Sequence, residues 1–189
     1  MDIRMRQYCL SAWNFIDPVY FQCTRLQYIQ KACGNQSILR VRLTKYKGRD
    51  IVLSDGTPIK KNDVLVKIHL HNSKLLQQME SCHSEIRRAL YIYQAVKESL
   101  PFVIRYIQTQ KNHEQIKGLI GITMLYKGCK KLGFEPYPII HPFYKHFKKF
   151  SLLPIYFLSS ARAFNKEIPS PMYLFMSRDT LMSRYGHNN

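Results

Sequence analysis

The chain has 189 residues, of which 46% are hydrophobic, 13% aromatic and 22% charged. This apolar content excludes an intrinsically disordered chain and predicts one globular domain over residues 1–189. The 29 Lys and Arg residues outnumber the 12 Asp and Glu residues, for a net charge of +17, so we expect an anionic partner such as nucleic acid, anionic lipid, a charged polymer or a phosphorylated small molecule.

The cysteines and the first residues bear on the compartment. The five cysteines are odd in number and form no CxxC motif, so we expect buried thiols in a reducing compartment. Arg4 and Arg6 precede an apolar stretch, as in a signal peptide, but Trp13, Asn14 and Asp17 interrupt it and no small-residue cleavage site follows. No apolar run reaches the length of a membrane span. The expected location is therefore the cytoplasm.

The first part of the chain is predicted to form a helix followed by an antiparallel β-meander. Apolar residues at helical spacing indicate one kinked helix or two short helices over residues 8–29. Apolar and polar residues then alternate over residues 38–44 and 64–71, which is typical of half-buried strands. A short apolar run at 51–53 and a turn at 54–57 lie between them, so we expect three consecutive strands.

A long central helix is predicted over residues 72–99, where an apolar stripe recurs at helical spacing and Asn72 or Ser73 can cap the start. Pro101 is expected to break or restart this helix. The patterns then predict a strand over 116–122, a helix over 124–132, an extended stretch over 134–140, a helix within 141–164 interrupted at Pro154, a strand over 173–176 and a helix over 179–185. This order favours a single α/β or α+β domain with a mixed sheet, an N-terminal meander, a long central helix and C-terminal strand-helix units.

Seven short blocks of the sequence are distinctive when taken in order. They read RVRLTKYKG at 40–48, LSDGT at 53–57, DVLVKIHLHN at 63–72, GITML at 121–125, LGFE at 132–135, MSR at 176–178 and RYG at 184–186. In this order they resemble the bacterial YkoP-like domain family, and the resemblance covers most of residues 10–186. Domains of this family also occur beside polysaccharide deacetylase modules, so the resemblance implies a task at a cell-envelope glycan or lipid. It carries no catalytic residues over to this chain.

His69 and His71 are two positions apart on a predicted strand, so both imidazoles point to one side of it. A structural or capping role is the first interpretation, and anion or substrate binding together with Lys67 is the second. A metal site is the third, but zinc needs three or four ligands and His83 is the one obvious addition. We therefore assign no metal. If the protein is an enzyme, His69 and His71 are the best candidates for a general acid or base.

Arg40 and Arg42 alternate with apolar residues on another predicted strand, and Lys45 and Lys47 follow them. One face of this strand therefore projects guanidinium groups that can grip phosphate or carboxylate in a bidentate manner. The alternative, which we favour on frequency, is the solvated face of an amphipathic strand. Specific nucleic-acid binding is not expected, because no helix-turn-helix, RRM or KH signature is present.

A basic and aromatic segment over residues 141–150 combines phenylalanines on one helical face with lysines off it. The residues concerned are Phe143, Phe147 and Phe150, with Lys145, Lys148 and Lys149. No acidic residue lies between Glu135 and Glu167. Such a helix can lie on an anionic membrane at the inner face. The alternative is an ordinary helix that packs its rings onto the sheet, and we favour this alternative.

Two hypotheses for the function follow. The first is a non-catalytic accessory module that binds an anionic cell-envelope component, either a glycopolymer or a lipid headgroup. Its binding residues are Arg40, Arg42, Lys67, His69, His71 and Asn72. The second is a transferase with an anionic activated donor such as coenzyme A, which predicts a deep pocket that joins His69 to the Gly121 region. The glycine-rich loop expected for such a donor is missing, so we assign no cofactor.

Overall fold

The computed structural model describes residue 11 and residues 26–30, 36–79, 84–159 and 168–186. Six strands form one mixed sheet. In spatial order they are β1 (Gln27–Gln30), β2 (Gln36–Lys45), β5 (Val64–Leu70), β6 (Ile116–Thr123), β8 (Met172–Ser177) and β7 (Glu135–Pro138). Strands β5 and β6 are parallel and every other neighbouring pair is antiparallel. The predicted α+β domain with a mixed sheet is confirmed.

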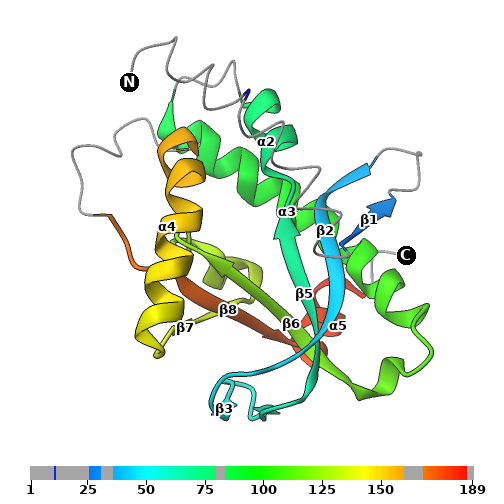
Figure 1. The fold of residues 1–189 in the computed structure, drawn as a ribbon. Helices are drawn as coiled ribbons and strands as arrows, with labels where there is room; N and C mark the ends of the chain where they lie inside the picture. Colours follow the sequence, from blue (N-terminus) through cyan, green and yellow to red (C-terminus); the bar gives the residue numbers. More distant parts are fainter. Residues whose placement is uncertain (1–10, 12–25, 31–35, 80–83, 160–167, 187–189) are drawn as a thin grey trace.

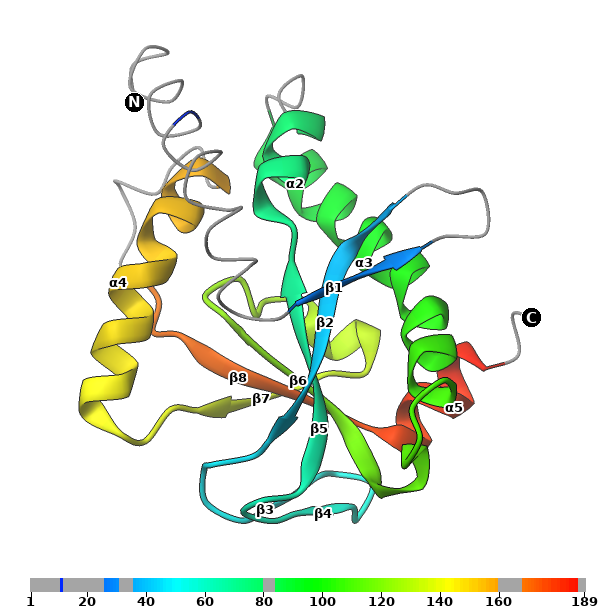
Figure 2. The same ribbon diagram turned by 45° about the vertical axis from the view of Figure 1, so that its right-hand side comes forward.

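Helices lie on both sides of this sheet. The helical elements are α2 (Asn72–Gln78), α3 (Glu85–Gln108), η1 (His113–Gln115), η2 (Cys129–Leu132), α4 (Pro142–Ser159) and α5 (Arg178–Tyr185). Helices α3 and α5 cover one face of the sheet, whereas α4 stands on the other side, near β7 and β8 (Figures 1 and 2). Among the described residues, no helix lies over the part of the second face between β2 and α4.

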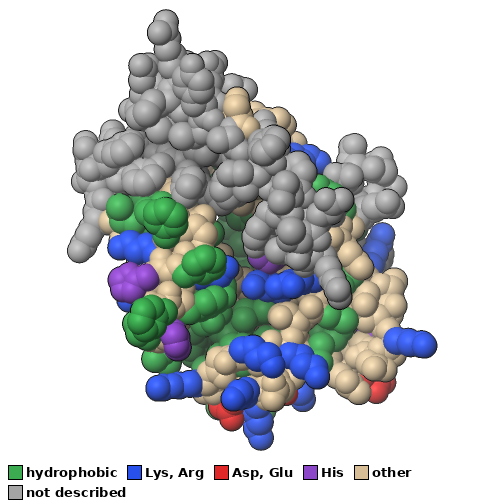
Figure 3. All heavy atoms as spheres, in the orientation of Figure 1, with side chains coloured by type: hydrophobic (Ala, Val, Ile, Leu, Met, Phe, Trp, Pro, Cys, Tyr) green, Lys and Arg blue, Asp and Glu red, His purple; other side chains and the backbone are tan. Residues whose placement is uncertain are grey.

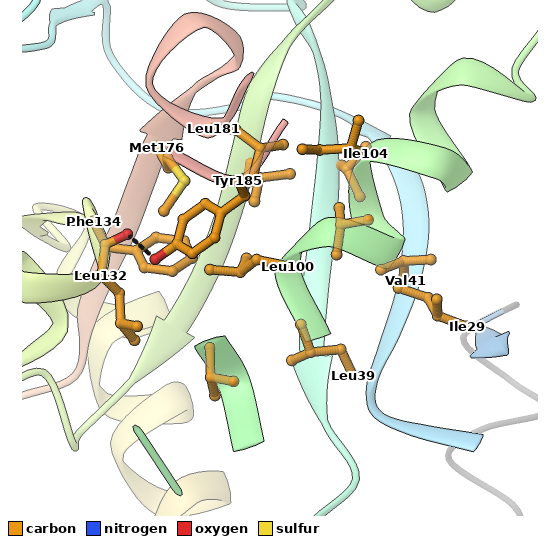
Figure 4. Close-up of a cluster of buried hydrophobic side chains, with 14 of the residues drawn as sticks. Ile29, Leu39, Val41, Leu100, Ile104, Leu132, Phe134, Met176, Leu181 and Tyr185 are labelled. Carbon is orange, nitrogen blue, oxygen red and sulfur yellow. Dashed lines mark hydrogen bonds between the residues drawn. The ribbon is translucent and has the colours of Figure 1, made fainter. Parts of the chain in front are cut away.

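The main core lies between the sheet and helices α3 and α5. Leu39, Val41 and Leu100 are at most 1% exposed within it, and they lie together with side chains of α5 and β8 in Figure 4. The Tyr185 hydroxyl donates a hydrogen bond of 3.0 Å to the carbonyl oxygen of Leu132, so the one polar group of this ring is satisfied inside the core.

A smaller aromatic cluster lies on the opposite face of the sheet. Its buried members are Tyr46, Leu53, Ile59, Leu65, Ile120 and Phe175. The Phe175 ring meets the rings of Tyr46 and Tyr137 edge to face, at centroid distances of 5.4 and 5.7 Å, an arrangement that aromatic quadrupoles favour. The short hairpin of β3 (Ile51–Val52) and β4 (Pro58–Ile59) covers this end of the face.

The hairpin is inserted between β2 and β5, which pair directly with each other, so the meander contains a separate two-stranded sheet. Its turn lies at residues 54–57, as predicted. Glu135 accepts hydrogen bonds from the Ser54 backbone N–H at 3.0 Å and from the Ser54 hydroxyl at 2.7 Å. Asp55 accepts hydrogen bonds from the hydroxyls of Ser177 and Thr180, at the start of α5. The hairpin is thus fixed to β7 and to α5.

We expect Asp55→Ala to lower the free energy of unfolding by about 1–2 kcal/mol at neutral pH, because the Ser177 and Thr180 hydroxyls lose their acceptor. Partial burial alone would raise the pKa of Asp55, but hydrogen bonds led by that of Ser177 outweigh this effect and lower the pKa to about 2. The contribution of Asp55 to the free energy of unfolding is therefore present above the ordinary aspartate pKa and is lost as the pH falls through about 2. Urea unfolding at several pH values measures it.

Glu114→Gln removes an exposed carboxylate of η1 and is the matched control, with an expected change below about 0.5 kcal/mol. If Asp55→Ala and Glu114→Gln unfold at the same urea concentration, Asp55 does not hold the hairpin in place.

Two parts of the chain differ from the predicted helices. Residues 27–30 form strand β1, because pairing of Tyr28 with Arg40 of β2 places Ile29 in the core, 5% exposed. The predicted helix over 8–29 is therefore wrong at its C-terminal end. Residue 11 is helical, and the other residues of 8–25 lie outside the described part. Over 124–132, helical structure is limited to η2, because Gly128 has a φ of 87° that interrupts an α-helix.

The predicted helix over 72–99 consists of α2 and α3, and two prolines do not interrupt their helices. Helix α3 continues through Pro101, because Leu100, Val103 and Ile104 are at most 1% exposed there and this packing outweighs the cost of about 3 kcal/mol of an internal proline. Helix α4 continues through Pro154. The carbonyl four residues earlier belongs to the exposed Phe150, on a side of the helix where water can satisfy it.

Candidate anion-binding site

Strands β2 and β5 place four basic side chains on the sheet face opposite α3. In the antiparallel register, Arg40 is opposite His69 and Arg42 is opposite Lys67. The alternate residues of the same strands, among them Val41, point into the main core. Because side chains alternate along a strand, the apolar pattern that buries one face forces these basic groups together on the other face.

Helix α4 adds a fifth basic side chain to this group. The positive charge of Lys148 lowers the pKa values of Lys67 and His69, so it lies within electrostatic reach of both. Its Nζ lies 5.5 Å from the centroid of the Tyr144 ring, and Tyr144 stacks on Tyr173 of β8 at 6.4 Å. We name Arg40, Arg42, Lys67, His69 and Lys148 the basic cluster. In Figure 3, Lys, Arg and His side chains border a hollowed part of this face between α4 and β2.

Arg40 is held in place by the edge strand. It is 2% exposed, its Nη2 donates to the Tyr28 hydroxyl at 2.8 Å, and its Cζ lies 4.9 Å from the centroid of the Tyr28 ring. A cation over an aromatic face is stabilised by the ring quadrupole. Pairing of β1 with β2 therefore fixes the direction of this guanidinium group.

The proximity of like charges changes the protonation of the cluster. Burial, followed by the charges of Lys67, Arg42, Lys148 and Arg40, lowers the pKa of His69 to about 3. Burial and the charges of Lys148 and Arg42 lower the pKa of Lys67 to about 8, and the pKa of Lys148 is lowered for the same kind of reason. At neutral pH the imidazole is thus neutral among cations whose mutual repulsion an anion would relieve.

His71 and Asn72 lie just beyond the basic cluster. His71 occupies the N-cap position of α2 but makes no side-chain capping bond, and its ring packs against Tyr28 at 5.5 Å. Asn72 is the first residue of the helix, so the prediction that it caps α2 is wrong by one position. Within the described ranges, no group of three His, Cys, Asp or Glu side chains is placed to hold a metal ion.

The phenylalanines of α4 do not pack on the sheet, so the interpretation that we favoured is wrong. Phe143, Phe147 and Phe150 are 82%, 63% and 78% exposed, and we name them the aromatic ridge. The inward side of α4 carries Tyr144 and Lys148 instead, because Tyr144 has an aromatic partner on β8. Over the described part of the chain, no helix has both the length and the apolar character needed to cross a membrane.

Gly121, named in the transferase hypothesis, lies on β6 together with Gly118. Gly118 and Gly121 lie inside β6, where a Cβ on Gly118 would overlap the backbone of Met176 and one on Gly121 would press on Ile68. These glycines permit close packing of strands. A cavity of about 440 Å³ lies beside η1 and α5, with Glu114 and Arg178 among its lining residues, and neither His69 nor Gly121 lines it.

Sequence reasoning missed the contributions of Lys148, Tyr28, Tyr144 and Tyr173 to this face. The one signal for Lys148 was its position four residues after Tyr144, which places both on the helix side away from the phenylalanines.

Comparison with known proteins identifies the family of this chain. Residues 6–185 match the YkoP domain. The chain belongs to the YkoP family. A relative from Bacillus subtilis (strain 168), named "Uncharacterized protein YkoP", is 48% identical over 181 residues, which cover 96% of this chain and 98% of the relative. No solved structure matches this YkoP-family chain.

Proposed function

We propose that this YkoP-family protein binds an anionic cell-envelope component, a glycopolymer or a lipid headgroup, as a non-catalytic accessory module on the cytoplasmic side. The observation that carries the proposal is the convergence of the basic cluster from three elements, β2, β5 and α4, on one half-buried face. Scattered surface cations are well solvated, whereas cations that raise one another's energy in a hollow favour an anionic ligand.

The chemistry of the cluster suits phosphate or carboxylate. The guanidinium group of Arg42 offers a planar set of donors for two oxygens, and Lys67 and Lys148 contribute compact charges. His69 adds an uncharged imidazole beside these cations. Tyr144 and Tyr173 line the adjacent part of the face, where their rings can contact the apolar side of a sugar or glycerol unit.

We expect the double substitution Arg42→Gln with Lys67→Gln to weaken binding of a soluble poly(glycerol phosphate) roughly 30-fold, since two charge-assisted contacts are lost. Titration calorimetry at low and high salt measures the effect, and the salt dependence should decrease in the variant. The same titration with short-chain phosphatidylglycerol distinguishes a headgroup from a polymer as the source of the anion.

The matched control is Lys45→Gln with Lys47→Gln, which removes two positive charges from largely exposed positions at the end of β2. We expect this control to change the affinity less than about threefold. Equal weakening in both double variants would mean that net charge, and not the basic cluster, attracts the anion. Thermal stabilisation by coenzyme A but by neither anion would overturn the proposal in favour of the transferase.

A further inference from the structure

The aromatic ridge is a continuous apolar strip on the outside of the protein. Its three residues are spaced by four and three positions along α4, so their rings lie in a row on one side of the helix. Ile140, just before the helix, is 56% exposed as well. Single exposed apolar residues are common, but contiguous strips of large rings mark interaction surfaces.

The ridge is not a core face that lacks its packing partner within the domain. The opposite side of α4 is already packed, since Tyr156, Leu152 and Leu153 form a cluster with Met124 and Tyr144 stacks on β8. A helix with one packed side is fully accounted for by the fold. The rings exposed on the described part of the structure are therefore available for contacts outside the domain.

The charges around the ridge select the kind of surface that it contacts. Lysines follow the ridge along the flanks of α4, and residues 136–166 contain no acidic side chain. They are Lys145 and Lys149, whereas Lys148 lies beside Tyr144 on the inward side. Rings that enter the headgroup region with lysines at the level of the phosphates are typical of helices that lie in a membrane interface.

We propose that the aromatic ridge docks on an anionic lipid bilayer, so that the anion taken up by the basic cluster is a lipid headgroup. This inference rests on the proposed function, because it names the source of the anion. Lys148 connects the two surfaces, since its Nζ lies 5.5 Å from the rings of both Tyr144 and Phe147. A bilayer against the ridge brings headgroups to Phe147, whose ring lies next to Lys148 of the basic cluster.

The test uses the full chain and vesicles of phosphatidylcholine with and without phosphatidylglycerol. We expect the triple variant Phe143→Ser, Phe147→Ser and Phe150→Ser to partition onto the mixed vesicles roughly 30-fold more weakly, because three rings no longer leave water. It should still bind soluble poly(glycerol phosphate) with the parental affinity. That second measurement separates a failure of this inference from a failure of the proposed function.

The matched control is Ile86→Ser with Leu90→Ser, which removes exposed apolar residues (79% and 56% exposed) from α3 and should leave vesicle binding unchanged. Insertion is measured directly with Phe147→Trp and Leu90→Trp: brominated lipids should quench the added emission of the first and not of the second.

Two results would overturn the inference. One is vesicle binding that is the same in the triple variant and in the parental protein. The other is a concentration-dependent dimer, seen by analytical ultracentrifugation, that the triple variant abolishes while vesicle binding persists, because the ridge would then be an interface with a second copy.

Discussion

Gly118→Ala is expected to destabilise the fold by at least about 4 kcal/mol, enough to remove most of the stability of a typical domain. A Cβ at this position would lie 2.2 Å from the carbonyl oxygen of Met176 and 3.0 Å from the Cα of Ser177. Both atoms belong to the backbone of β8, which is hydrogen-bonded to β6. The clash can therefore be relieved only by separating two strands in the middle of the sheet. Rearrangement of side chains cannot relieve it.

Gly121→Ala, in the same strand, is the matched control. Its Cβ would lie 3.3 Å from the Cγ1 atom of Ile68, at the flexible part of a side chain, so we expect a loss of about 1–2 kcal/mol. Thermal and urea unfolding of both variants measure the difference. A Gly118→Ala protein that unfolds with the same midpoint as Gly121→Ala would show that β6 and β8 are not so closely paired.

His69 is expected to make the stability fall as the solution becomes acidic. Its pKa is lowered to about 3 by burial and by four cations from three elements, Lys67 on β5, Arg42 and Arg40 on β2, and Lys148 on α4. In the unfolded chain the imidazole has its ordinary pKa near 6.5. Between these two pKa values the unfolded state binds a proton that the folded state does not, so stability decreases as the pH falls through this window.

The size of this effect is measured by urea unfolding from pH 7 down to pH 4. We expect His69→Gln to remove about 3 kcal/mol of the decrease over this range, because glutamine has no proton to bind in either state. His146→Gln, at an exposed position on α4, is the control for the loss of a histidine. Parallel stability curves for the parental protein and His69→Gln would contradict the placement of His69 among these cations.

The set of basic side chains that share the sheet face opposite α3 could be predicted, because it depends on a local pattern. Alternation over residues 38–44 and 64–71 fixes which side chains share a face, and the β2–β5 register then brings Arg42 opposite Lys67. The role of Lys148 could not be predicted, since it depends on where α4 lies against β8. Ring stacking between Tyr144 and Tyr173, which are 29 positions apart in the chain, is one of the contacts that hold it there.

Two other differences between the predicted and the observed structure also arise from tertiary contacts. An i, i+4, i+7 row of phenylalanines is compatible with a helix that faces the core and with one that faces outward, so periodicity alone does not decide the exposure of Phe147. Local propensity also favours a break at Pro101, but burial of Leu100 and Val103 against the sheet decides the outcome. In both cases tertiary contacts, which the local pattern does not contain, determine the result.

The attachment of the β3–β4 hairpin also bears on how the protein is made. Asp55 and its partner Ser177 are separated by 122 residues. During synthesis the turn at 54–57 therefore cannot form this hydrogen bond until Ser177 has been added to the chain. Contacts of such long range slow folding, because the chain between the two partners must close into a loop first. Ribosome-bound chains that stop before residue 172 should therefore be cleaved readily by proteases, although they contain every residue of β2 and β5.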